Sequence, residues 1–447
     1  MTNRLQPFLN IQTVFNKENE RTVEILKTVY NDHAYLLSVI ESVSGESLTK
    51  EAISGKKVLL KPNWVKHSYQ STDEICLRTH DNFLVAVLES VLSKGPSEVT
   101  IGDAPIQGCN WDKMIQPGLL KKIEALSAAY TIPVTIKDFR RTLYNTIANT
   151  LETTRRPLSE YIIFDTGTQS YLEPITTTEK NLFRVSQYNP DKFTQTHRPG
   201  VHKYCIAKEL FSADIVISLP KIKTHEKTGI TCALKNIVGL NGDKDFLPHH
   251  RIGGTDKGGD SYPGNNRLRY LSELAHDNAN RRIGKPGYRF WKRVASLLWR
   301  FSFPKNDHRL NGAWHGNDTT WRMVMDLNMI INYGKADGTL SAELQRPLYS
   351  FCDGIIAGQG NGPLRPDPLS LGIICFSNSA ALTDTCMAIL IGLKTEKLPL
   401  LMAARSFITD HEKIIRLNGN PVTEDDLKTY GVVAALPPGW VNYEKAS

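Results

Sequence analysis

The sequence lacks any uninterrupted apolar run of the roughly 18 residues that a membrane-spanning helix requires. The longest apolar helix that it predicts, over residues 380–393, is short and contains Asp384. The first residues, MTNRLQPFLNIQ, have no charged segment followed by an apolar one, so we expect no signal peptide. These absences exclude an integral membrane protein with helical spans and favour a cytoplasmic one.

Cysteine is also scarce and scattered. The 447 residues contain seven cysteines, an odd number, with no CxxC pair or other clustered spacing. This pattern offers neither a disulfide framework nor the four thiolates of an iron–sulfur cluster. We therefore expect reduced thiols that mostly serve packing, which again favours the cytoplasm. Composition alone leaves the cofactor unknown.

Acidic residues are almost absent from one segment. Between Arg281 and Arg309 there are nine Lys or Arg and one acidic residue, Asp307. Nine minus one is eight, which equals the net charge of +8 for the whole chain. The remainder is balanced, so we expect no general nucleic-acid binding.

The chemistry-bearing residues concentrate in residues 213–239, ADIVISLPKIKTHEKTGITCALKNIVG. The run Ile215–Ile217 with Leu219 predicts a buried strand that Pro220 ends. Cations, hydroxyls and an imidazole follow, and a second apolar run then carries Lys235 and Asn236. Ligands of open α/β sheets bind beyond the carboxyl ends of strands, so this segment predicts a site for an anion. The alternative is a solvated basic loop.

Strand and helix patterns alternate on the N-terminal side. Strands are predicted at 58–60, 98–101 and 134–137, with a helix over Asp81–Leu92 between the first two. This spacing predicts parallel βαβ units and an α/β fold with a mainly parallel sheet, flanking helices and a long insertion before the last third. We expect a helical lead-in (1–55), the two halves of the core (56–240 and 318–447) and an insertion (241–317).

The predicted cleft gathers polar residues at the strand ends. His225 is the candidate general acid or base, Lys235 would neutralise developing charge, and Asp103 is a further acid–base candidate with a helix cap as its alternative role. The predicted substrate-binding residues are Asn63, Lys221, Lys223, Thr224, Asn236, Asp353, Gly358, Gly360 and Gly362. The three glycines follow a strand and would present amides to an anion. Asp384 would need a partner, for which Lys235 or Lys223 is the candidate, or an exposed face.

The insertion carries two further hypotheses. Residues 241–282 predict a poorly ordered, Gly-rich segment that acts as a mobile lid or linker. His249, His315 and Asp318 are candidate ligands for a divalent metal, although their spacing matches no strict motif.

The segment Tyr288–Phe301 predicts an amphipathic helix. Phe290, Trp291, Val294, Leu297, Leu298 and Phe301 share one helical face, and four cations lie off it. Such a helix would either dock on an anionic membrane surface or pack on the body of the protein.

The central segment LPKIKTH followed by GITCALKNIVG resembles the family called domain of unknown function 362. KPNWV at residues 61–65, GDAP at 102–105, DGIIAGQGNGP at 353–363 and Asp384 fit it as well. The resemblance implies a shared fold without an established reaction. The ten-residue spacing of His225 and Lys235 also resembles the lactate racemase family, in which lysine and histidines serve a nickel-pincer nucleotide. The Gly-Gly step of that family is Thr231-Cys232 in this chain.

Three functional hypotheses follow. The first is an enzyme for an anionic small molecule, namely a carboxylate, a sugar phosphate or a nucleotide sugar. The second is a metal- or cofactor-dependent enzyme of the isomerase or racemase kind. The third is a non-catalytic protein that docks on a membrane or polyanion through Tyr288–Phe301.

Overall fold

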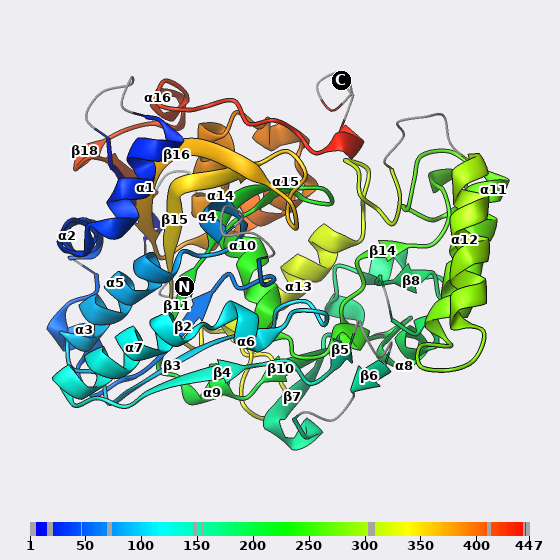
Figure 1. Ribbon diagram of the computed structural model, residues 1–447, viewed down its shortest axis with the longest axis horizontal. Helices are drawn as coiled ribbons and strands as arrows, with labels where there is room; N and C mark the ends of the chain where they lie inside the picture. Colours follow the sequence, from blue (N-terminus) through cyan, green and yellow to red (C-terminus); the bar gives the residue numbers. More distant parts are fainter. Residues whose placement is uncertain are drawn as a thin grey trace.

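The computed structural model describes residues 6–15, 21–45, 47–68, 74–145, 150–152, 156–186, 188–302, 309–408, 413–440 and 443. Its centre is an 11-stranded sheet (Figure 1). The strand order is β18 (Asn420–Pro421), β17 (Ile414–Leu417), β1 (Phe8–Thr13), β16 (Asp367–Ser377), β15 (Leu348–Gln359), β11 (Ile215–Leu219), β2 (Lys57–Pro62), β3 (Glu98–Asp103) and β4 (Val134–Asp138). Two more strands, β12 (Lys221–His225) and β13 (Gly229–Thr231), pair outside this path.

The half of the sheet that carries the site is parallel. Strands β15, β11, β2, β3 and β4 pair in parallel, whereas β16 is antiparallel to both β15 and β1. The prediction of an α/β fold with a mainly parallel sheet is confirmed. The carboxyl ends of β2, β3 and β11 therefore meet at one edge, where ligands of such sheets bind.

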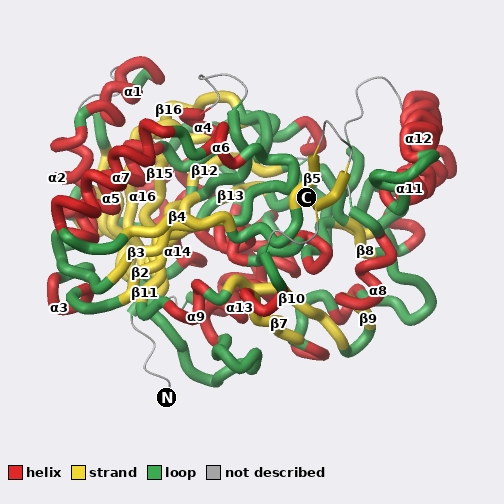
Figure 2. The backbone as a smooth tube through the Cα atoms, turned by 60° about the horizontal axis from the view of Figure 1, so that its bottom comes forward, coloured by secondary structure: helices red, strands yellow, loops and turns green. Residues whose placement is uncertain are grey.

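Helices cover both faces of the sheet (Figures 1 and 2). One face packs on α1 (Val23–Asn31), α2 (His33–Ser44), α5 (Asp81–Leu92) and α7 (Pro117–Tyr130). The other packs on α10 (Ala233–Asn236), α13 (Thr320–Tyr333), α14 (Ala380–Leu390) and α15 (Pro399–Ala404). Successive strand residues point to opposite faces, so Ile215 and Ile217 join the first core and Val216 the second.

The first 55 residues, expected to be a helical segment before the core, also contribute a strand to the central sheet. Helices α1, α2 and α3 (Lys50–Ile53) lie there, but Phe8–Thr13 form β1, between β16 and β17. Leu9 and Ile11 of this strand are buried and alternate with polar residues. This period-two pattern is short, and the long helical periodicity that follows concealed it. The proposed domain boundaries remain predictions.

Several segments on either side of β11–β13, between residues 139 and 345, build a smaller β-rich region beside the sheet. Its short sheets are β5 (Leu143–Asn145) with β6 (Thr150–Glu152), β7 (Tyr161–Asp165) with β10 (Val201–Ala207) and β9 (His197–Arg198), and β8 (Phe183–Arg184) with β14 (His250–Arg251). The remaining short helices are α4 (Glu74–Leu77), α6 (Trp111–Met114), α8 (Phe193–Thr196), α9 (Glu209–Ser212) and α16 (Glu424–Lys428).

The predicted low-order segment 241–282 is instead folded. It contains the helix α11 (Arg267–Asn280), and Gly242, Gly254 and Gly259 pack tightly against their neighbours. A Cβ on Gly259 would lie 2.1 Å from the carbonyl oxygen of Gly253. Buried Asp260 accepts hydrogen bonds from the Arg251 amide at 2.5 Å and the Thr319 hydroxyl at 2.6 Å. Gly254 and Gly259 therefore serve close backbone packing, and Gly253, Gly258 and Gly264 serve turns with positive φ. Composition alone does not distinguish these roles from flexibility.

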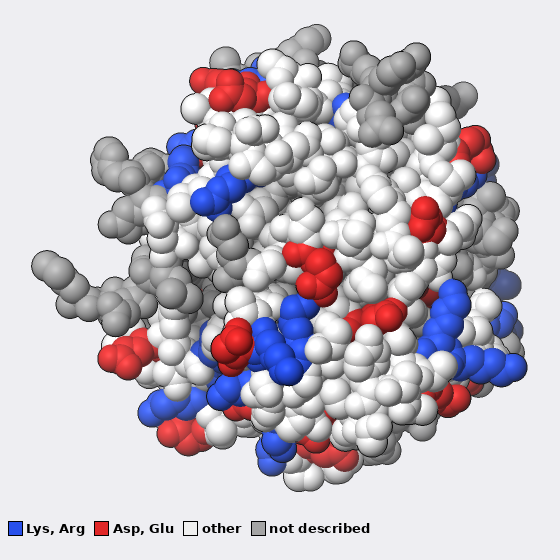
Figure 3. Space-filling model, turned by 90° about the vertical axis from the view of Figure 1, so that its left-hand side faces the viewer, with Lys and Arg blue, Asp and Glu red and all other residues white. Residues whose placement is uncertain are grey.

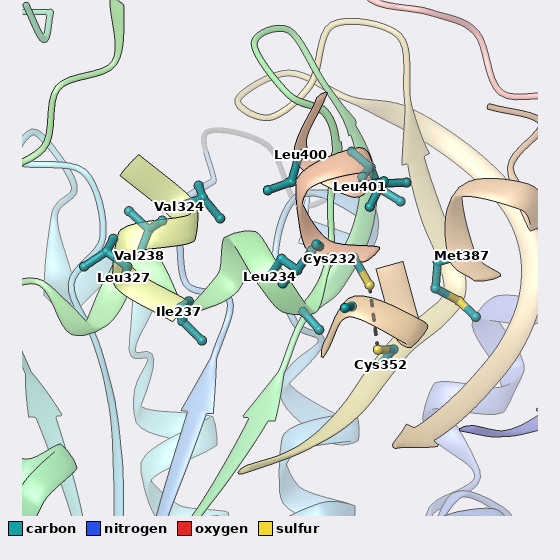
Figure 4. Close-up of a cluster of buried hydrophobic side chains, with 14 of the residues drawn as sticks. Cys232, Leu234, Ile237, Val238, Val324, Leu327, Cys352, Met387, Leu400 and Leu401 are labelled. Carbon is teal, nitrogen blue, oxygen red and sulfur yellow. Dashed lines mark hydrogen bonds between the residues drawn. The ribbon is translucent and has the colours of Figure 1, made fainter. Parts of the chain in front are cut away.

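Two absences apply to the part of the chain that the structure describes. It contains no helix with the length and apolarity to cross a bilayer. All seven cysteines are buried and unbridged, with the sulfur atoms of Cys232 and Cys352 3.8 Å apart (Figure 4).

Candidate functional site

The segment Lys221–His225 is a strand, not the loop that the sequence predicts. It continues beyond Pro220 as β12, antiparallel to β13 and parallel to β15. Strand β15 is 12 residues long and pairs with β11 and then with β12, so the chain stays beside it. Lys221 and Lys223 are both 0% exposed. The alternative of a solvated basic loop is therefore wrong.

Lys221 and Asp353, both predicted to bind substrate, bind each other. The Lys221 ammonium lies 3.0 Å from the Asp353 carboxylate, and both side chains are fully buried. The Tyr30 hydroxyl donates to Asp353 at 2.6 Å and accepts from Lys221 at 2.9 Å. This pair neutralises one charge inside the protein, so neither group is free for a ligand as the structure stands.

Asp103, a predicted acid–base residue, is the counter-ion of Lys61. Its carboxylate lies 2.8 Å from the Lys61 ammonium and accepts hydrogen bonds from the amides of Trp64 at 2.7 Å and Ala104 at 2.9 Å. A Cβ on Gly239 would lie 1.7 Å from the same carboxylate. The absence of a side chain at Gly239 thus lets α10 and the following turn approach the ion pair.

The amides of Asn63 and Asn236 orient the lysines. The Asn236 side-chain oxygen accepts from the Lys61 ammonium and from the Asn63 amide, both at 3.0 Å. The Asn63 oxygen in turn accepts from Lys223 at 3.2 Å. Lys223 also donates to the Leu77 carbonyl at 2.5 Å, and burial lowers its pKa to about 7. Both asparagines are thus bonded within the protein, and a direct substrate contact by either remains a prediction.

Lys235 lies among other cations. Burial and the neighbouring Lys244, Lys227 and Lys61 lower the pKa of Lys235 to about 7. Burial also lowers the pKa of Lys244 to about 8. We call Lys61, Lys223, Lys227, Lys235 and Lys244 the lysine cluster. Asp103 pairs with one member, Lys61, and Lys235 and Lys244 are partly exposed, so the cluster reaches solvent with excess positive charge.

Two histidines lie within the lysine cluster in complementary tautomers. His225 Nδ1 accepts hydrogen bonds from the amides of Lys227 at 3.0 Å and Thr228 at 3.3 Å, which places its proton on Nε2. His249 Nδ1 lies 2.7 Å from the Leu247 carbonyl and donates to it, which leaves a lone pair on Nε2. Burial and the nearby lysines hold the pKa of both imidazoles well below its usual value. The site therefore combines one neutral donor and one neutral acceptor.

The three predicted metal ligands do not meet. His249 lies in the lysine cluster, His315 contacts Trp314 and Trp440, and Asp318 binds Arg322 at 3.1 Å. Across the described ranges, no three His, Cys, Asp or Glu side chains form a group able to hold a metal ion. The Nε2 proton of His225 also leaves that nitrogen without a lone pair for a metal.

The glycine loop packs on β12. The Thr224 hydroxyl donates to the Gly360 carbonyl at 3.1 Å, and a Cβ on Gly362 would lie 1.9 Å from the Thr224 carbonyl oxygen. The Gly360 amide donates to the Ala435 carbonyl at 2.7 Å, and the Gly362 amide to that of Gly360 at 2.8 Å. A Cβ on Gly358 would lie 2.7 Å from the Lys223 Cβ. The amides of Gly360 and Gly362 are thus occupied within the protein and do not form the expected anion nest, whereas a substrate contact by Gly358 remains a prediction.

Asp384 has a partner that the sequence did not predict. Both of its oxygens lie 3.3 Å from the Leu234 amide at the start of α10, and burial raises the pKa of this carboxyl to about 7. The expected partners were lysines, and the alternative was an exposed face, but Asp384 is 0% exposed. On α10 and the turn after it, Leu234, Ile237 and Val238 join the apolar core (Figure 4), which fixes the direction of Lys235.

The sequence predicted His225 and Lys235 for one site, and in the structure burial lowers the pKa of His225 and Lys235 is close enough to lower it further. Three cluster members, Lys61, Lys227 and Lys244, were not among the predicted catalytic or substrate-binding residues. Lys61 follows the apolar run 58–60 near the end of β2, and Lys227 closes the basic run, so each had a signal in the pattern. Lys244 lies in a polar turn that has no such signal.

A family model described as "Domain of unknown function (DUF362)" matches residues 165–389, half of the chain. The chain belongs to this family. The DUF362 match contains β12, α10 and the glycine loop, whereas Lys61 and Asp103 lie N-terminal to it.

Comparisons with individual proteins add little to the DUF362 assignment. No curated protein matches the chain. A crystal structure of a Thermotoga maritima protein from the Northeast Structural Genomics Consortium aligns with 8% identity and a TM-score of 0.31. The alignment covers 76% of this chain and 56% of the other, so the chain spans just over half of that protein's length. A TM-score this low supports no conclusion.

Proposed function

We propose that this DUF362 protein is an enzyme that binds a small anion in the lysine cluster and uses His249 as the proton acceptor and His225 as a hydrogen-bond donor in acid–base catalysis. The anion would be a carboxylate, a sugar phosphate or a nucleotide sugar. The observation that carries the proposal is a group of neighbouring amines without acidic partners: burial lowers the pKa values of Lys223, Lys235 and Lys244 to about 7 or 8, and none of them forms an ion pair with a described residue.

Lysines without acidic partners raise the free energy of the unliganded protein, and a bound anion would lower it. Charged groups are stable in a protein interior only when an opposite charge accompanies them. A bound anion would raise the pKa of Lys235 and of both imidazoles towards their ordinary values, because it offsets desolvation and repulsion. Ligand binding would therefore bring these groups to the pH range in which acid–base catalysis is efficient.

The tautomers define the roles. His249 would accept a proton through its Nε2 lone pair, and His225, a neutral imidazole, would donate a hydrogen bond from its Nε2 to the oxygen on which negative charge develops. Lys235 would stabilise negative charge that develops on the substrate. These roles fit proton transfer next to a carboxylate or phosphate, which includes isomerisation.

The test is anion binding by wild type and by Lys235→Ala. Calorimetry with carboxylates, sugar phosphates and nucleotide sugars should find a ligand for the wild type, and the variant should lose at least roughly tenfold in affinity, because a charged hydrogen bond is removed. Lys121→Ala is the matched control, since Lys121 is exposed on α7. Equal binding by wild type and Lys235→Ala would refute the proposal, provided that circular dichroism shows both to be folded.

The metal- or cofactor-dependent alternative is less well supported by the geometry. The His225 tautomer and the separation of His249, His315 and Asp318 both argue against these residues as a ligand set. Elemental analysis and an absorbance spectrum of purified protein would reveal a bound metal or chromophore.

A further inference from the structure

The helices α11 and α12 (Tyr288–Ser302) form a hairpin at one edge of the molecule, far from β18 and α2 (Figure 1). They pack along each other: the Ser272 hydroxyl donates to the Ala295 carbonyl at 2.7 Å, and the Asn266 amide to the Ser302 carbonyl at 3.1 Å. Ala295 and Ser302 are buried in this contact. One side of α12 is thus covered by α11.

The side of α12 away from this contact exposes large apolar residues. Phe290, Leu297 and Phe301 are 62%, 57% and 71% exposed. Their spacings of seven and four residues place them in one line along the helix. Leu268 and Leu271 of α11 are each 39% exposed on the same hairpin. The prediction that the apolar face packs on the body of the protein is therefore wrong for these three α12 residues.

A line of arginines accompanies the apolar line. Arg289, Arg293 and Arg300 are exposed, and their spacings of four and seven residues place them together beside Phe290, Leu297 and Phe301. Helix α12 has no acidic residue, and none of these arginines forms an ion pair with a residue that the structure describes. The opposite end of the molecule differs, because there basic and acidic side chains are intermixed on the surface (Figure 3).

We propose that the α11–α12 hairpin docks on an anionic lipid bilayer. Phe290, Leu297 and Phe301 would enter the boundary between headgroups and acyl chains, and the arginine line would bind lipid phosphates and carboxylates. An apolar line next to cations, on a helix without acids, is the composition that an anionic interface attracts. A bilayer accommodates both lines at once, because its apolar and anionic layers lie side by side. This surface is separate from the lysine cluster and does not depend on the proposed enzyme activity.

The test is co-sedimentation of the full chain with vesicles of phosphatidylcholine, with and without phosphatidylserine. We expect binding at low salt that requires phosphatidylserine. The combined variant Phe290→Ser, Leu297→Ser, Phe301→Ser should bind at least roughly tenfold more weakly, because buried apolar area is lost. The combined variant Arg289→Gln, Arg293→Gln, Arg300→Gln should lose roughly a hundredfold. Leu344→Ser with Met402→Ser is the matched control, since these residues are 45% and 53% exposed outside the hairpin.

Three outcomes would overturn the proposal. The first is that the wild type does not bind phosphatidylserine vesicles at low salt. The second is that the serine variant binds them as well as the wild type does. The third is that the wild type self-associates and that the serine changes abolish this self-association. Analytical ultracentrifugation of wild type and serine variant distinguishes the last case, in which a second copy of the chain covers the hairpin. Because all six residues are exposed or lie on the surface helix, circular dichroism should show native folding for each variant.

Discussion

Lys221 and Lys223 are two residues apart in β12, and the same substitution should change stability at the two positions for different physical reasons. Lys221→Met leaves the buried Asp353 carboxylate without its cation, so we expect a loss of about 3–5 kcal/mol in unfolding free energy. Lys223→Met removes a buried cation that has no carboxylate partner in the described structure, so it relieves a cost and loses the hydrogen bonds to Leu77 and Asn63.

The cost at Lys223 follows from its pKa. The pKa is lowered from 10.5 to about 7, so between these values the unfolded chain binds a proton that the folded chain does not. Wild-type stability therefore rises with pH across this window. The cost of burying Lys223 is about 4 kcal/mol near pH 7 and falls to about 2 kcal/mol near pH 9. The two lost hydrogen bonds remove roughly 1–3 kcal/mol each at any pH.

The signature of Lys223→Met is consequently its pH dependence. The unfolding free energy of Lys223→Met minus that of wild type should fall by about 2 kcal/mol between about pH 7 and about pH 9. Urea unfolding of wild type, Lys221→Met and Lys223→Met over this range measures it, with Lys121→Gln as the surface control. A stability difference that stays constant with pH, or a Lys221→Met protein as stable as wild type, would refute the reasoning.

Three further predictions concern the same region. Gly239→Ala should lower the unfolding free energy by about 3–5 kcal/mol, because its Cβ would lie 1.7 Å from Asp103 and break the ion pair with Lys61. The control is Gly118→Ala, whose Cβ would have no atom within 4 Å and which should be near neutral. Thermal unfolding of both variants measures the difference. The pKa of Asp384 is raised from 3.8 to about 7, so the stability that its protonated form contributes at low pH is lost as the pH rises through 7. Asp384→Asn should remove about 4 kcal/mol of this dependence of the unfolding free energy on pH. Urea titrations measure it, and a profile equal to that of wild type would contradict the prediction. Anion binding near pH 8 should take up protons, because Lys235 with a pKa of about 7 is mostly neutral there; calorimetry in buffers of different ionisation enthalpy measures the uptake, and proton release would contradict it.

The fold was predictable where periodicity was strong. The apolar strands β2, β3 and β11 and the helix α5 have patterns that nothing else in the chain contradicts. Strand β12 was not predictable, because K-I-K-T-H has the composition of a loop and becomes a strand only beside the long β15. Helix α11 was hidden by the glycines and polar residues before it.

The site was predictable in kind but not in detail. His225 and Lys235 stood out because cations gather after a strand end, and the geometry places them together. Pairings such as Lys221 with Asp353 and Lys61 with Asp103 join residues far apart in sequence, so no local pattern distinguishes a paired lysine from a free one. The tautomers of His225 and His249 depend on backbone groups whose positions only the fold defines.

The strand order of the central sheet indicates whether the part of the chain that matches the family model could fold as an independent domain. The residues that identify the family, 165–389, contain β11, β15 and β16 but neither β2, the neighbour of β11, nor β1, the neighbour of β16. A fragment limited to them would expose two apolar strand edges, those of β11 and β16, which invite aggregation, and would lack Lys61 and Asp103. The segment that carries the family signature is therefore no autonomous module. The lysine cluster also needs Lys61 of β2 and its counter-ion Asp103 of β3, and both strands lie outside the residues that match the family model.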